Sequence, residues 1–295
     1  MCEIELKGLD GSNLLAYLAA LGTLRVLTLA EPGRDVRMRW VDRGYWMPVV
    51  HGTSAETADE FLSLLAQRVC GEESADAVWK IGKDLTLGCG EFGDRMREGV
   101  AKAAHEQRVS VDFLAAFGSD VYGAGPKREL MSDTGFRTMS GAGHQHFLGF
   151  MLELAAGTEV EHLRRALLAP WDYADGRPSL RWDAADFRPH ALRAVDPSGD
   201  PIKTMRGANR LAIEALPLFP TAPKTRRIRT TAFQEGDNGT EIWWPIWTDA
   251  LELGTVASLL AAGDARVRPG VAQVYRATRF TEGKYRNFSP SKAKM

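Results

Sequence analysis

The feature that most constrains the fold of this chain is an apolar run near its start, GSNLLAYLAALGTL at residues 11–24. The run is shorter than the roughly 20 apolar residues that span a bilayer, and Arg25 follows it at once. Turn and N-cap residues lie at Asp10 to Asn13 and predict a helix that runs to about Ala30. Because this helix would be apolar nearly all round, we expect it to be the buried spine of the N-terminal part.

Around this spine the sequence predicts a mixed α+β fold, with helical N-terminal and central parts and a small, mostly antiparallel sheet. The alternating segments at residues 36–41 and 45–50 indicate a hairpin. Further strands are expected late in the chain, near residues 228–233, 241–247 and 271–280. A content of 44% hydrophobic and 25% charged residues is typical of a globular protein.

A segment rich in Pro, Asp and Gly, at residues 170–202, is the best candidate for a domain boundary. It would separate a mainly helical domain with an N-terminal β-hairpin, residues 1–170, from an α+β domain with basic segments, residues 171–295. The alternative is one long loop within a single domain.

Charge is distributed unevenly along the chain, although the formal net charge is only −1. From Lys203 to the end there are 15 Lys and Arg against 8 Asp and Glu, which leaves 22 against 30 for the preceding residues. This asymmetry indicates that the basic end binds a polyanion or that the two ends bind each other.

Several signatures of catalysis are missing from the sequence. Gly82-Lys83 and Gly283-Lys284 are not followed by Ser or Thr, so neither forms a phosphate-binding loop. No histidine is followed by Asp, and no G-x-S-x-G occurs. We therefore expect no enzyme activity and no cofactor. The three cysteines, Cys2, Cys70 and Cys89, are widely spaced and favour a reducing, cytoplasmic setting.

The first candidate binding segment is IKTMRGANRLAIEALPLFPTAPKTRRIR, residues 202–229. We expect Gly207 to permit a tight turn and Asn209 to cap a helix over residues 210–216. Arg206 and Arg210 would flank that helix N-terminus and form either a phosphate seat or a solvated basic face. Beyond the helix, the predicted nucleic-acid-binding residues lie on an extended segment and are Lys224, Arg226, Arg227 and Arg229.

The second candidate segment interleaves cations with aromatic residues at residues 275–288. Its predicted binding residues are Arg276, Arg279, Lys284, Tyr285 and Arg286. Cations that neutralise phosphates, next to aromatic rings that stack on bases, are typical of proteins that bind single strands. The alternative is a strand whose aromatic residues enter the core while its charges face water.

The segment MSGAGHQHF at residues 139–147 supplies three further candidates, Gly143, His144 and His146. We expect both histidines in a first helical turn, where free N–H groups favour a phosphate or interface contact. On a helix the two side chains point about 200° apart, so they could not share a metal. A structural role stays open, and no metal site is predicted.

Five segments, in this order, resemble proteins encoded in CRISPR type I-G loci, formerly called I-U. They are GLDGSNLLAYLAALGTLRVL, MSGAGHQHFL, SLRWD, IKTMRGANRLAIEALPLFP and WWPIWT. Such proteins occur beside the Cas helicase–nuclease or as an extension of it. The start of the chain is also similar to the large subunit of the type I-G effector.

The resemblance implies a non-catalytic subunit or accessory protein of an RNA-guided DNA surveillance complex in antiviral defence. Its partners would be other effector subunits, the helicase–nuclease, and guide RNA or target DNA, with no membrane involved. In such complexes base pairing with the guide RNA recognises the target sequence, and protein contacts mainly hold the nucleic-acid backbone. Two alternatives stay open: a protein-binding scaffold between effector and nuclease, and a metal-dependent nuclease that uses His144 and His146.

Overall fold

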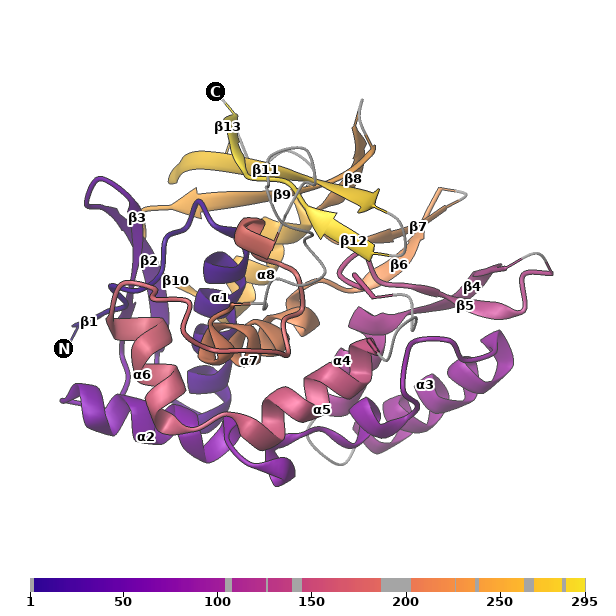
Figure 1. The fold of residues 1–295 in the computed structure, drawn as a ribbon, viewed down its shortest axis with the longest axis horizontal. Helices are drawn as coiled ribbons and strands as arrows, with labels where there is room; N and C mark the ends of the chain where they lie inside the picture. Colours follow the sequence, from indigo (N-terminus) through magenta and orange to yellow (C-terminus); the bar gives the residue numbers. More distant parts are fainter. Residues whose placement is uncertain are drawn as a thin grey trace, which may run out of the picture.

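The computed structural model describes residues 3–103, 108–125, 127–139, 145–186, 203–225, 227–236, 239–262, 268–282 and 285–294. These residues form eight α-helices and several small antiparallel sheets, which confirms the predicted mixed α+β fold (Figure 1). The helices are α1 (Leu14–Ala30), α2 (Ala58–Val69), α3 (Cys89–Ala103), α4 (Val109–Phe117), α5 (Phe147–Gly157), α6 (Val160–Leu168), α7 (Arg206–Ala215) and α8 (Leu253–Ala261).

The strands form two larger sheets and two separate hairpins. The N-terminal sheet has the order β1-β3-β2-β10 and consists of β1 (Glu3–Glu5), β2 (Arg37–Asp42), β3 (Trp46–His51) and β10 (Leu251–Glu252). The C-terminal sheet has the order β12-β11-β9-β8, with β13 also paired to β11. Its strands are β8 (Phe233–Gly236), β9 (Gly239–Trp247), β11 (Val271–Glu282), β12 (Tyr285–Phe288) and β13 (Lys292–Lys294). The hairpins are β4 (Gly118–Ala124) with β5 (Leu130–Asp133), and β6 (Thr221–Lys224) with β7 (Arg227–Thr230).

Helix α1 is the buried spine that its sequence predicts. The Asn13 side chain caps it by accepting a hydrogen bond from the Ala16 N–H, and every residue from Leu14 to Leu27 is buried. A Cβ at Gly22 would come within 1.8 Å of the Leu211 carbonyl oxygen, so this glycine lets α1 and α7 approach closely. Within the described residues, no helix has the length and apolar character needed to cross a membrane.

A buried ion triad joins α1 to α7. The Glu214 carboxylate accepts a hydrogen bond from Arg25 at 2.7 Å through one oxygen and from Arg210 at 2.9 Å through the other. The Arg25 guanidinium also lies over the Phe113 ring, and that of Arg210 lies over the Trp79 ring. Arg25, which ends the apolar run, is therefore held inside the core by charge pairing and aromatic contact.

An aromatic cluster fixes α1 against both larger sheets. The Tyr17 ring stacks on Trp40 of β2 and also contacts Trp244 and Trp247 of β9. The two β9 indoles donate hydrogen bonds to backbone carbonyls near the N-terminus, from Trp244 to Gly11 and from Trp247 to Met38, each at 2.8 Å. The tryptophans of β9, late in the sequence, therefore pack in the same core as strand β2, near its start.

The hydrophobic core crosses the predicted boundary between residues 170 and 171. Its buried residues form one cluster that extends from Ile4 to Phe288. Strand β10 pairs with β2, and α7 packs on α1, so elements from the second predicted part complete structures of the first (Figure 1).

Within the described residues, one long edge of β9 is paired with another strand over only part of its length. Strand β8 pairs with β9 from Gly239 to Ile242, and the Trp243 N–H then donates to the Ala232 carbonyl. Further along this strand lies Pro245, which has no N–H to donate. On its other edge the end of β9 pairs with β11, and α8 also contacts β9.

We expect Glu214→Gln to lower the free energy of unfolding by about 3 kcal/mol, because it leaves two buried guanidinium groups without a carboxylate. Urea unfolding with a constant m-value measures this loss. The control is Glu91→Gln, which breaks an exposed i,i+4 pair with Arg95. We expect this control to cost at most about 0.5 kcal/mol. Equal losses in the two variants would contradict the structural role of the triad.

Candidate nucleic-acid interface

The N-terminus of α7 binds a carboxylate from another segment of the same chain. The Arg206 backbone N–H donates to the Asp175 carboxylate at 2.8 Å, and the Arg206 guanidinium donates to the Arg177 carbonyl. The Asp175 side chain is only 8% exposed and also pairs with Arg165 at 2.8 Å. The sequence left a phosphate seat and a solvated basic face open at this helix end, and the structure places a carboxylate of the protein there.

Three other residues predicted at this seat lie inside the core instead. The helix begins at Arg206, so Asn209 does not cap it; its side chain accepts a hydrogen bond from the Leu180 N–H at 2.9 Å. Gly207 lies within the helix rather than in a turn, and a Cβ there would come within 2.2 Å of the His162 carbonyl oxygen. Arg210 is fully buried in the ion triad. These three residues are buried and stabilise the fold, so they cannot contact a nucleic acid.

The β6–β7 hairpin places the next predicted cations at the surface. Lys224 and Arg227 are exposed and Arg229 is partly exposed. Within the described ranges, no carboxylate lies within 4.0 Å of any of these three cations. Arg226 lies outside the described residues. The hairpin therefore carries positive charge that the described part of the protein leaves unpaired.

A second hairpin, whose turn carries two exposed cations, contacts the first and was not predicted from the sequence. Strand β4 contacts both β6 and β7, and the two hairpins extend from this contact on the same side of the molecule (Figure 1). The β4–β5 turn carries Lys127 and Arg128, both exposed. The signal in the sequence is a pair of cations after Gly-x-Gly, between segments that can pair as strands.

Most cations of the second basic segment are held by internal partners. Arg276 forms an ion pair of 2.8 Å with Glu241, whose side chain is buried. Arg279 donates to the Gly135 carbonyl at 2.8 Å, and burial, together with nearby Arg286, lowers the pKa of its guanidinium. Arg286 itself is partly exposed and donates to the Arg137 carbonyl. Lys284 and the Tyr285 side chain lie outside the described part of the chain.

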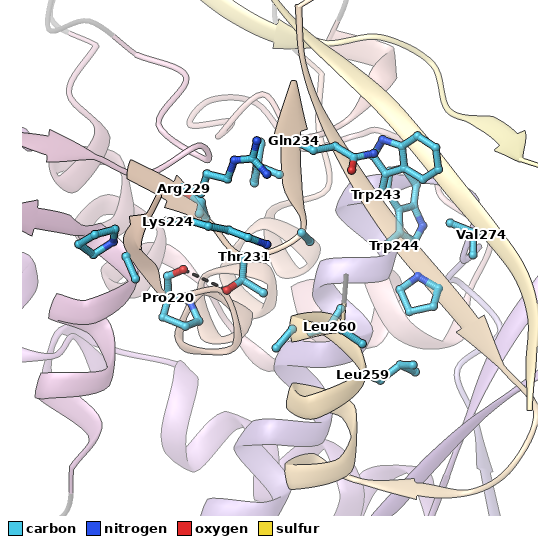
Figure 2. A pocket seen from close by; sticks show the side chains of 18 residues that line it. Pro220, Lys224, Arg229, Thr231, Gln234, Trp243, Trp244, Leu259, Leu260 and Val274 are labelled. Carbon is cyan, nitrogen blue, oxygen red and sulfur yellow. Dashed lines mark hydrogen bonds between the residues drawn. The ribbon is translucent and has the colours of Figure 1, made fainter. Parts of the chain in front are cut away.

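Between the β6–β7 hairpin, β9 and α8 lies a cavity of about 340 Å³, which we call the hairpin groove (Figure 2). Figure 2 shows Lys224 and Arg229 on one side and Gln234 and Trp243 on the other, with Leu259 and Leu260 of α8 below. The lining also includes Pro220, Pro223, Trp244, Pro245 and Val274. The groove thus combines cations, an amide, an indole and an apolar floor.

His146 lies at a different surface. It precedes α5 as the N-cap residue but makes no side-chain cap, and its buried Nδ1 has no hydrogen-bond partner in the described structure. It lines a cavity of about 390 Å³ with Lys83 and Asp84. Gly143 and His144 lie outside the described residues. Among those described, no group of three or more His, Cys, Asp or Glu side chains could hold a metal ion.

Comparison with known proteins adds no functional assignment to this geometry. No protein-family model matches the chain, and no curated protein sequence matches it. The interface is therefore interpreted from its own side chains. Exposed guanidinium and ammonium groups bind anions, and the side chains around the hairpin groove add hydrogen bonding and aromatic surface.

The division between internal and surface cations can be tested by removing one of each. Arg276→Gln should lower the free energy of unfolding by about 2 kcal/mol, because the buried Glu241 carboxylate loses its cation. Arg227→Gln should change it by less than about 0.5 kcal/mol, because the side chain is exposed. Thermal and urea unfolding measure both. A larger loss for Arg227→Gln than for Arg276→Gln would show that the division is wrong.

Proposed function

We propose that this chain is a non-catalytic, nucleic-acid-binding subunit or accessory protein of a type I CRISPR surveillance complex in the cytoplasm. The observation that carries the binding part of this proposal is the pair of adjacent hairpins. Their exposed or partly exposed cations are Lys127, Arg128, Lys224, Arg227 and Arg229. In the described structure none of them has a carboxylate within 4.0 Å.

The arrangement of these cations suits a phosphate backbone. The β6–β7 hairpin carries three of these cations, and β4, which contacts it, leads to the turn that carries the other two next to the exposed Glu129. Binding to such a surface is electrostatic, tolerant of sequence and steeply dependent on salt. Two other cations of the basic end, Arg210 and Arg276, are paired internally and contribute to folding instead.

The assignment to a CRISPR complex rests on the sequence resemblance to type I-G proteins. In that setting the hairpins would contact guide RNA or target DNA, while other effector subunits and the Cas helicase–nuclease would be protein partners. The scaffold alternative differs in a measurable way, because its protein complex would survive nuclease treatment and retain no RNA or DNA. A nuclease that uses His144 and His146 would lose metal-dependent cleavage when both are replaced by Ala.

We expect Lys127→Glu combined with Arg227→Glu, one reversal from each hairpin, to weaken binding to a single-stranded oligonucleotide at least tenfold at low salt. The slope of log affinity against log salt should fall by roughly 0.7 for each phosphate that the variant no longer neutralises. Fluorescence anisotropy over a range of salt concentrations measures both quantities.

The matched control is Arg43→Glu, which reverses an exposed arginine in the β2–β3 turn, at the other end of the molecule (Figure 1). Its affinity and salt slope should remain close to those of the unsubstituted protein. If the double variant folds and binds as tightly as this control, the hairpins are not the nucleic-acid interface.

A further inference from the structure

The hairpin groove has two chemically different walls. On the hairpin side Lys224 and Arg229 line it with positive charge, and Arg229 also lines a second hollow next to it. On the sheet side it is lined by Gln234 of β8 and by Trp243 and Pro245 of β9. A ligand that fits both walls has an anionic end and a flat, largely apolar end that can hydrogen-bond.

The cationic wall is available to a ligand. Lys224 is exposed, and the Arg229 guanidinium makes no ion pair or hydrogen bond with another side chain in the ranges described. Figure 2 shows both side chains beside the space that faces Gln234 and Trp243. Two cations at one end of a cavity favour a phosphate group, for which a guanidinium supplies several donors at once.

The sheet wall is held in place by contacts outside the groove. The Trp243 indole donates to Glu241 at 2.9 Å, and the cationic groups of Arg276 and Lys294 both lie 5.7 Å from its ring centre. These contacts fix the indole before any ligand arrives. The Gln234 amide can donate and accept at once, which is the pattern that base edges present.

We propose that the hairpin groove receives one unstacked base of a single-stranded nucleic acid, with its phosphate held by Lys224 and Arg229. This inference rests on the proposed function and refines it from nucleic acid in general to a single strand. The cavity of about 340 Å³ is at the small end of the roughly 300–1,000 Å³ range of ligand pockets, which suits one nucleotide. A base in a duplex is paired and stacked, so it cannot enter the groove without leaving the helix.

The decisive experiment compares two strands of equal length and charge, one with bases and one abasic, as DNA and as RNA. The unsubstituted protein should bind the strand with bases about tenfold more tightly, because an aromatic wall contributes only when a base is present. Gln234→Ala and Trp243→Leu should each reduce this preference while leaving abasic binding unchanged. Because Trp243 is partly buried, Gln234→Ala keeps the test valid if Trp243→Leu folds poorly.

Arg227→Glu is the control, since this residue is on the hairpin but does not line the groove. It should weaken binding to both strands by the same factor. Equal affinity of the unsubstituted protein for the two strands would overturn the base pocket and leave the proposed function intact. Failure to bind either strand would overturn both. A preference for bases that survives Gln234→Ala and Trp243→Leu would place the base contact elsewhere and overturn the inference.

Discussion

The pairing of two buried guanidinium groups with one carboxylate is the constraint on which the rest of the structure depends. Glu214 lies between Arg25 and Arg210, at the contact between α1 and α7. A charge that leaves water must be paired and hydrogen-bonded, so these two helices have one compatible arrangement. Gly22 permits the close approach that this arrangement requires. Through α1 and α7 the first and last parts of the chain become one core.

The same constraint decides which basic residues remain for binding. Arg206 and Arg210 look like part of one basic segment with Lys224 and Arg227, yet α7 uses the first two internally. The turn after α7 leads directly into β6, so a helix anchored in the core presents a hairpin whose cations face solvent. The fold thus separates structural arginines from surface ones within about twenty residues of sequence.

Elements with a strong local pattern were predictable from the sequence. The spine helix, its cap at Asn13 and the β2–β3 hairpin follow from periodicity and turn chemistry. The α+β class was also predictable, because helical and alternating segments both occur. Late strands such as β9 and β11 could be recognised by their aromatic and β-branched residues, although not the sheet to which each belongs.

The candidate site was only partly predictable, because partners distant in sequence decide it. Asparagine is a residue type that favours the N-cap position, as at Asn209. The Asp175 carboxylate, from another segment, instead accepts a hydrogen bond from the Arg206 N–H, and α7 begins there. Nothing next to Arg210 shows that Arg25 will share its carboxylate. Lys127 and Arg128 could not be predicted as binding residues, because a glycine-rich segment is as typical of a loop as of a hairpin. Their importance depends on the neighbouring β6–β7 hairpin.

The end of β9 that β8 does not reach has a consequence for how this protein can associate. Its residues 244–247 are buried, but in the described part of the chain no strand pairs with this edge, and such an edge can attract another strand. Here Pro245 interrupts the row of donors at that edge, so an added strand would find a missing hydrogen bond at the centre of its pairing. The proline thereby discourages backbone partners and keeps the neighbouring groove open to ligands that bind through side chains.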